Sequence, residues 1–264
     1  MADTHDALMD DPVHALQDGS AGIRFAYARA RLAGAQKSSA SVPAYLRFVN
    51  RRLGGKLAVL AYGLRLTPVQ VTLMSSAASL CGIALLALHR SSIPTGIVVS
   101  LLLLLGYALD SADGQLARVR GGGTKAGEWL DHVTDVLKMS SLHSAVAVAV
   151  LRFFDLSSLL YLAVPIVFLV ANMTQFFGMM MRDKLSPSPG NRPTDSSSLI
   201  VSFMLAPLDH GTLALAFLFL GLHTVFLWCY GFLALCTVLF SARSLTKAYR
   251  GLLAVELRST PPQQ

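Results

Sequence analysis

The chain has 264 residues, of which 53% are hydrophobic and 14% are charged, and its formal net charge is +7. A soluble globular domain carries about 25% charged residues, so this composition excludes an ordinary soluble protein and indicates a membrane protein. The basic residues lie at the ends of predicted helices and not among aromatic residues on one surface, which excludes nucleic acid as a partner and favours anionic lipid headgroups.

The N-terminal part of the chain precedes the apolar segments. Residues 1–40 are predicted to be a mostly disordered or loosely helical tail without the basic and apolar regions of a signal peptide, so we expect no cleaved export signal. From Val42 to Leu66, apolar residues recur at helical spacing among the basic residues Arg47, Arg51, Arg52, Lys56 and Arg65. This pattern predicts an amphipathic helix that lies on the membrane surface.

Six membrane-spanning helices are predicted after this surface helix. Thr67 and Pro68 provide an N-cap and a first-turn proline for the first span. Glycines 121–123 end the second span, and Pro207 and Asp209 leave the start of the fifth span open. The predicted spans cover residues 68–88, 93 to about 110, 125–151, 158–181, a stretch between 196 and 221, and 223–245.

The distribution of basic residues predicts the orientation. Six spans place both termini on one side, and that side carries nearly all Lys and Arg, whereas the other side has essentially Arg90 and Arg152. The positive-inside rule then places both termini in the cytoplasm. We therefore predict one all-α membrane domain over residues 41–250, followed by a C-terminal tail over 251–264.

Four aspartates lie where the second predicted span ends and the third begins. Asp110 and Asp113 are three residues apart, and Asp131 and Asp135 are four apart, so each pair shares a helix face. Four carboxylates at one point near the cytoplasmic surface would repel one another unless cations lay between them. Oxygen ligands favour Mg²⁺ or Mn²⁺, and two such ions about 3.5 to 4 Å apart could hold a pyrophosphate and polarise its phosphorus.

The stretch from Asp110 to Asp135 resembles the signature of the CDP-alcohol phosphotransferase family, D-x-x-D-G-x-x-A-R-x8-G-x-x-x-D-x-x-x-D. Every specified position matches: Asp110, Asp113, Gly114, Ala117, Arg118, Gly127, Asp131 and Asp135. A weaker resemblance in helix layout extends over residues 42–250. It implies a homodimeric membrane transferase that moves a phosphoalcohol group from a CDP-alcohol to an acceptor hydroxyl, releasing CMP without a covalent enzyme intermediate.

The resemblance also implies a role for each signature residue. Asp110, Asp113 and Asp131 correspond to metal ligands, and Asp135 corresponds to a carboxylate that adjoins the metals and serves as the general base. The residues that correspond to the CDP-binding positions are Asp113, Gly114, Ala117, Arg118 and Gly127.

Two departures concern the substrates. The family often has Asn after Thr-Pro at the start of the first span, but this chain has Val69, so Gln70 or Thr72 must supply the polar contact if it exists. Glu128 and His132 resemble the choline and ethanolamine phosphotransferase branch. The favoured donor is CDP-diacylglycerol with a small polyol or its phosphate as acceptor, and the alternative is a soluble CDP-aminoalcohol with a lipid alcohol as acceptor.

Four further residues are candidates for acceptor binding: His132, Lys138, Arg182 and Lys184. Lys138 lies in an otherwise apolar helix, where it could contact the acceptor, balance charge or form a structural ion pair. Arg182 and Lys184 could bind an acceptor phosphate or anchor the helix end at the membrane. A function of another class, a cation-binding transporter, would spread carboxylates along a pathway, whereas here they gather near one surface.

Overall fold

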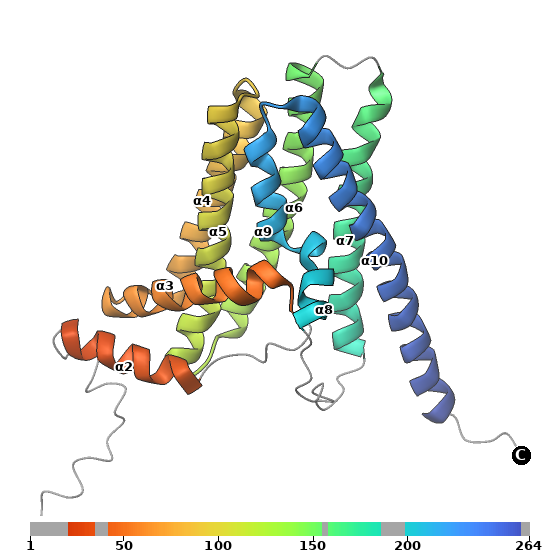
Figure 1. The fold of residues 1–264 in the computed structure, drawn as a ribbon. Coiled ribbons are helices and arrows are strands. Elements are labelled where there is room, and N and C mark those ends of the chain that lie inside the picture. Colours follow the sequence, from red (N-terminus) through yellow and green to blue (C-terminus); the bar gives the residue numbers. More distant parts are fainter. Residues whose placement is uncertain (1–20, 35–41, 155–157, 186–198, 260–264) are drawn as a thin grey trace, which may run out of the picture.

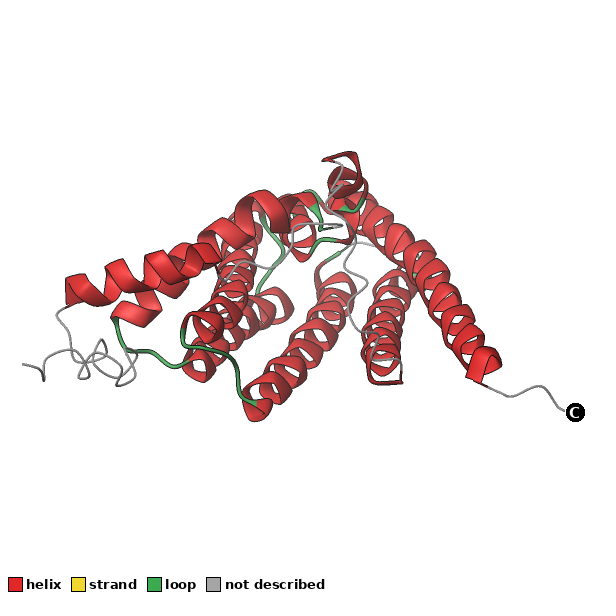
Figure 2. Ribbon diagram, turned by 90° about the horizontal axis from the view of Figure 1, so that it is seen from below, coloured by secondary structure: helices red, strands yellow, loops and turns green. Residues whose placement is uncertain are grey.

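The computed structural model describes residues 21–34, 42–154, 158–185 and 199–259, and all regular structure within these ranges is helical (Figures 1 and 2). The helices are α2 (Ala21–Gly34), α3 (Arg51–Gly63), α4 (Pro68–Leu88), α5 (Ile93–Val119), α6 (Lys125–Phe153), α7 (Ala163–Leu185), α8 (Leu199–Met204), α9 (His210–Ala216) and α10 (His223–Ser259). Single turns precede or connect some of them, at η2 (Leu46–Asn50), η3 (Leu159–Leu162), η4 (Ala206–Leu208) and η5 (Phe217–Phe219).

The predicted surface helix is α3, which lies across the lower part of α4 and α5 (Figure 1). Its inner side buries Ala58 and Tyr62, while Leu60 on the other side is exposed. Helix α2 packs on α3: Arg24 donates hydrogen bonds of 3.1 and 3.2 Å to the carbonyl oxygen of Gly63. Residues 21–34 of the expected tail are therefore helical, while 1–20 and 35–41 lie outside the described residues.

Five of the described helical segments are long and apolar enough to cross a membrane: Pro68–Leu88, Ile93–Val119, Lys125–Phe153, Leu159–Leu185 and His223–Glu256. Their outward residues, such as Leu101, Val170 and Trp228, are exposed apolar side chains, whereas the inside holds buried hydroxyls such as Ser75 and Ser100. Small and weakly polar residues between helices, with apolar residues outside, are typical of packing in lipid. The chain is a multi-pass integral membrane protein.

The first two spans pack closely, and their ends follow the sequence signals. Thr67 caps α4 in a capping box with Gln70. A Cβ at Gly106 would lie 2.0 Å from Ser79 Oγ, so α5 approaches α4 as closely as it does only because this residue is glycine. The Ser75 hydroxyl donates a 2.8 Å hydrogen bond to the Gly106 carbonyl and joins the two helices.

The expected fifth span is not one continuous helix. Between 199 and 219 the chain forms α8, η4, α9 and η5, because Pro207 cannot continue an α-helical hydrogen-bond ladder and the Asp209 side chain caps a new helix at Gly211 N, at 2.8 Å. This series still returns along α5: the His210 ring lies tilted against Tyr107, with centroids 5.7 Å apart, and a Cβ at Gly96 would lie 2.3 Å from Phe217 O. The last helix is longer than predicted, since no proline interrupts it before Pro261 and α10 runs to Ser259.

Candidate active site

A tight turn joins the two helices that carry the signature aspartates. Gly121 and Gly122 have φ values of +97° and +138°, which other residues rarely adopt, so these glycines let the chain reverse directly after α5. Thr124 then caps α6 by accepting a 3.0 Å hydrogen bond from Gly127 N. The turn therefore fixes the carboxylates at the end of α5 beside those at the start of α6.

Asp113 is the most buried of the four aspartates, with 5% of its surface exposed. The hydroxyl of Thr72, on α4, donates a 2.6 Å hydrogen bond to Asp113 Oδ2. Gln70 is engaged in the cap of α4 instead. Of the two residues that could replace the missing Asn, Thr72 is thus the one that contacts the signature.

A lysine joins the two helices at the inner side of the cluster. The Lys138 ammonium lies 2.5 Å from Asp110 Oδ1 and 2.8 Å from Asp135 Oδ1. Its side chain is 13% exposed, against 25% for Asp110 and 27% for Asp135, so the three groups are partly shielded from solvent. Among the readings that the sequence left open for Lys138, the structure shows the ion pair.

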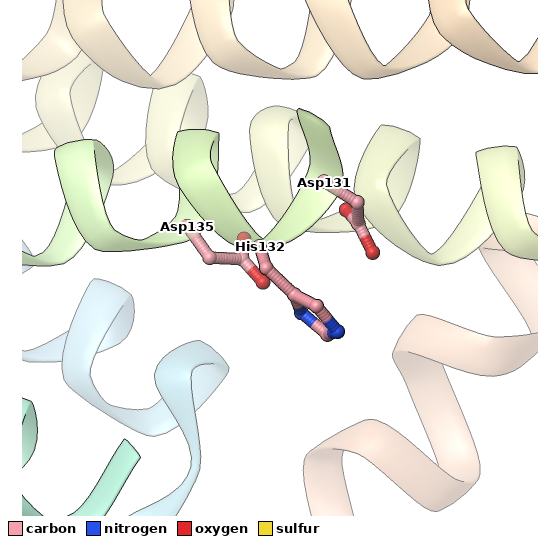
Figure 3. A group of neighbouring side chains, drawn as sticks. All are labelled: Asp131, His132 and Asp135. Carbon is pink, nitrogen blue, oxygen red and sulfur yellow. The ribbon is translucent and has the colours of Figure 1, made fainter. Parts of the chain in front are cut away.

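Asp131, His132 and Asp135 form a half-buried group at the outer side of the cluster. They project from the same stretch of α6, as Figure 3 shows, and each offers a ligand atom within 4.8 Å of the others. The His132 ring also packs edge-on against Phe176 of α7, with ring centroids 5.9 Å apart. This group is one that could hold a metal ion.

The cluster suits hard divalent cations for two reasons. Its carboxylates repel one another, Asp110 against Asp135 and Asp131, and Asp113 against Asp110 and Asp131. The Lys138 ammonium between Asp110 and Asp135 shows that a positive charge fits between the two helices. Carboxylate oxygens without thiolate ligands are the donors that Mg²⁺ and Mn²⁺ prefer.

The residues expected to contact CDP follow the aspartates on the same helix. Gly114 leaves space along α5 that Arg118 borders, since a Cβ at Gly114 would lie 3.4 Å from Arg118 Nη1. Ala117 and Gly127 are both half-buried near the turn. Arg51 of α3 was predicted only as a basic residue of the surface helix, but its guanidinium lies close enough to Arg118 for the two positive charges to repel each other. Burial lowers the pKa of the Arg51 guanidinium from its usual value.

The remaining acceptor candidates lie on α7, whereas the cluster lies on α5 and α6. Arg182 and Lys184 are exposed near the end of α7, and Arg182 forms a 3.5 Å ion pair with its neighbour Asp183. Residues 186–198, which hold most of the predicted basic loop, are outside the described part of the chain.

A cavity of about 320 Å³ extends from the lysine side of the cluster into the helix bundle. Asp110, Asp135 and Lys138 line one part of it, and the remaining lining comes from α4, α5, α6, α7, η4, α9 and α10. Tyr107 and His210 also line it and were not identified from the sequence. His210 could not be identified from the sequence, because the pattern around Pro207 and Asp209 does not define where its helix begins.

Comparison with known proteins identifies two similarities. The profile of the CDP-alcohol phosphatidyltransferase family matches residues 65–239, more than half of the chain. Phosphatidylinositol phosphate synthase from Corynebacterium glutamicum is 36% identical over 118 residues, which make up 44% of this chain and 51% of that protein. The chain thus matches about half the length of this curated relative.

Proposed function

The chain belongs to the CDP-alcohol phosphatidyltransferase family, and from this premise we propose that it transfers a phosphoalcohol group, in phospholipid biosynthesis, from a CDP-alcohol to an acceptor hydroxyl with release of CMP. The observation that carries the proposal is the gathering of all four signature aspartates where α5 ends and α6 begins. The relative named as a phosphatidylinositol phosphate synthase supports CDP-diacylglycerol as the donor.

The proposed roles follow from the contacts. Asp110, Asp113, Asp131 and Asp135 would hold two Mg²⁺ or Mn²⁺ ions. When bound, such ions supply charge that neutralises the carboxylates and polarises the phosphorus under attack. Thr72 holds the Asp113 carboxylate in one orientation through its 2.6 Å hydrogen bond. Arg118 and Arg51 supply positive charge to the diphosphate of CDP beside Gly114, Ala117 and Gly127.

The reaction needs one proton acceptor. Asp135 takes the proton from the acceptor hydroxyl, the hydroxyl oxygen bonds to the β-phosphorus, and the bond from that phosphorus to CMP breaks. Lys138, 2.8 Å from Asp135, would hold this carboxylate in position for the transfer. His132, whose ring packs against Phe176 of α7, would contact an acceptor bound beside the cluster.

We further propose that the chain crosses the membrane six times, with the series α8 to η5 as a broken fifth crossing, and that both termini and the aspartate cluster face the cytoplasm. Arg90 lies in the connection from α4 to α5 and Arg152 at the end of α6, and both of these segments are away from α3 (Figure 1), which supports this orientation. A homodimer is proposed from the resemblance, and the mass of the purified protein in detergent, measured by light scattering, tests it.

The test of the function is release of CMP by the purified protein with Mg²⁺ and a CDP-alcohol. Asp135→Asn should lower the rate by at least roughly a hundredfold, the usual contribution of a general base. Asp183→Asn, an exposed carboxylate outside the cluster, is the matched control and should keep full activity. Full activity of a folded Asp135→Asn variant would exclude the proposed base, and ion flux without CMP formation would favour the transporter.

A further inference from the structure

We propose that Asp209 is a positioning residue for the reaction. It joins the start of the surface helix, residues 44–50, to α9 and to Tyr107 of α5, and thereby fixes the face of α5 that carries Asp110. This inference rests on the proposed function, because the position of Asp110 matters through the divalent ions that the aspartates would hold. It gives a part in the reaction to contacts that lie outside the signature.

Asp209 is a buried carboxylate that accepts one backbone hydrogen bond on each oxygen. Only 2% of its surface is exposed. Its Oδ1 accepts a 2.8 Å hydrogen bond from Gly211 N in α9, and its Oδ2 accepts a 2.8 Å hydrogen bond from Leu46 N in η2. Both donors lie in the first turn of a helical segment, where N–H groups lack partners within the helix. One side chain therefore caps two segments that are far apart in the chain.

This arrangement requires a carboxylate. Serine, threonine or asparagine would suffice to cap α9 alone. A buried carboxylate costs more desolvation free energy than these side chains, so the single cap does not account for it. Both oxygens of a carboxylate accept hydrogen bonds, whereas an asparagine amide has one oxygen and one NH₂ donor. Asp209→Asn would therefore turn a donor toward one of the two backbone N–H groups.

A third contact links Asp209 to α5. The Tyr107 hydroxyl hydrogen-bonds to the Asp209 side chain. The Tyr107 ring stacks on Tyr45, with centroids 6.3 Å apart, and lies against His210, with centroids 5.7 Å apart. The Tyr107 carbonyl oxygen accepts a 3.1 Å hydrogen bond from Asn50 Nδ2. Tyr107 is thus held by the start of the surface helix and by α9 together.

Tyr107 connects these contacts to the aspartate cluster. It lies three residues before Asp110, so the two side chains are neighbours on one face of α5. Both line the cavity, and Asp135 and Lys138 line it from α6. A shift of α5 at Tyr107 would move Asp110 relative to Asp135. The contacts of Asp209 would therefore fix the two carboxylate pairs relative to each other from the side opposite the glycine turn.

The surroundings of Asp209 restrict movement of the surface helix. A Cβ at Gly211 would lie 2.0 Å from Tyr45 Cδ1, so α9 approaches residues 44–50 as closely as it does only because residue 211 is glycine. The Arg47 guanidinium donates a 3.1 Å hydrogen bond to Ser202 Oγ of α8. The start of the surface helix is thus attached to α8 as well as to α9.

Two variants test the inference through the dependence of CMP release on Mg²⁺ concentration. Asp209→Asn removes one backbone hydrogen bond, and Ser92→Ala removes the cap at the far end of α5, where Thr95 N donates to Ser92 Oγ at 3.3 Å. Both variants should lose stability, but only Asp209→Asn should raise the Mg²⁺ concentration for half-maximal activity, by at least roughly tenfold. Equal Mg²⁺ dependence in the two folded variants would overturn the inference. Absence of CMP release by the wild type would overturn the proposed function and this inference with it.

A double-mutant cycle tests the link through Tyr107. Tyr107→Phe removes the hydroxyl and leaves both caps in place, so it should also raise the Mg²⁺ requirement. Its addition to Asp209→Asn should cause no further rise, because two residues that act through one contact are not additive. A wild-type Mg²⁺ requirement in Tyr107→Phe, or effects that multiply in the double variant, would overturn the inference. If Asp209→Asn does not fold, Tyr107→Phe alone decides.

Thermal unfolding provides a readout without turnover. Weaker Mg²⁺ binding stabilises the folded state less, so the rise in unfolding temperature on adding Mg²⁺ should be smaller in Asp209→Asn than in the wild type. Ser92→Ala should show the wild-type rise from a lower starting temperature. An equal rise in Asp209→Asn and the wild type would show that Asp209 supports the fold alone, and would overturn its positioning role.

Discussion

The hydroxyl of Thr72 reaches a signature carboxylate from a helix outside the signature. A hydrogen bond to a charged group contributes about 1.5 to 3 kcal/mol, so Thr72→Val should lower kcat/KM roughly 10- to 100-fold. Thr72→Ser keeps the hydroxyl and should retain most activity. CMP release at a series of Mg²⁺ concentrations measures both variants. Equal rates for Thr72→Val and Thr72→Ser would show that the 2.6 Å contact with Asp113 has no part in the reaction.

Lys138 occupies a place between two carboxylates that the proposed ions would also use. Lys138→Met leaves Asp110 and Asp135 to repel each other, so the unfolding temperature without divalent cations should fall. Added Mg²⁺ would no longer compete with the ammonium, so the rise in unfolding temperature on adding Mg²⁺ should exceed that of the wild type. Thermal unfolding with EDTA and with Mg²⁺ measures this, with Lys184→Met as an exposed control. A smaller Mg²⁺ effect in Lys138→Met than in the wild type would contradict the prediction.

At the scale of elements, the turn between α5 and α6 sets the distance between the two carboxylate pairs. Gly122 has a φ of +138°, so Gly122→Ala should cost about 1 to 3 kcal/mol and lower activity by displacing α6. Gly123 has no such φ, and a Cβ there would lie 3.9 Å from Ala117 Cβ, so Gly123→Ala should be nearly neutral. Thermal unfolding and CMP release of the two variants measure the difference. A Gly123→Ala variant as impaired as Gly122→Ala would argue against backbone strain as the cause.

The helices that sequence predicted best are those whose signals are local. Thr67, Pro68 and the glycines after α5 define their ends through caps and turns within a few residues. The stretch from 199 to 219 could not be predicted in the same way, because Asp209 uses its second carboxylate oxygen to accept a 2.8 Å hydrogen bond from Leu46 N, far away in the chain. That contact depends on the tertiary structure.

The same distinction applies to the site. The spacing of the aspartates predicted that they gather, because two helix ends joined by a short turn must lie together. For Lys138, an ion pair was one of several roles that the sequence allowed, because spacing alone does not determine which carboxylates a flexible side chain will contact. The cavity was not predicted, because its walls come from seven separate elements and no sequence motif indicates that these elements lie together.

At the scale of the whole molecule, the proposed orientation has a direct test. In intact cells, a membrane-impermeant maleimide should label Arg90→Cys, which lies in the connection from α4 to α5, a segment away from α3 (Figure 1). Gly123→Cys, in the turn after α5, should be labelled only after the membrane is permeabilised. The native cysteines Cys81, Cys229 and Cys236 are first replaced by serine or alanine, and that variant serves as the background control. The opposite labelling pattern would place the aspartate cluster outside the cytoplasm.

The proposed broken crossing, from α8 to η5, also has a consequence for biosynthesis. A ribosome releases the residues of α4, α5 and α6 well before those of η4, α9 and α10, so the aspartates enter the membrane while several walls of the cavity have yet to be synthesised. Asp209 can bind Leu46 N only once the later segment has emerged. The later segment would then close the bundle over a cluster whose four aspartates are already in place, and a chain that stalls before this step would expose those charges to lipid.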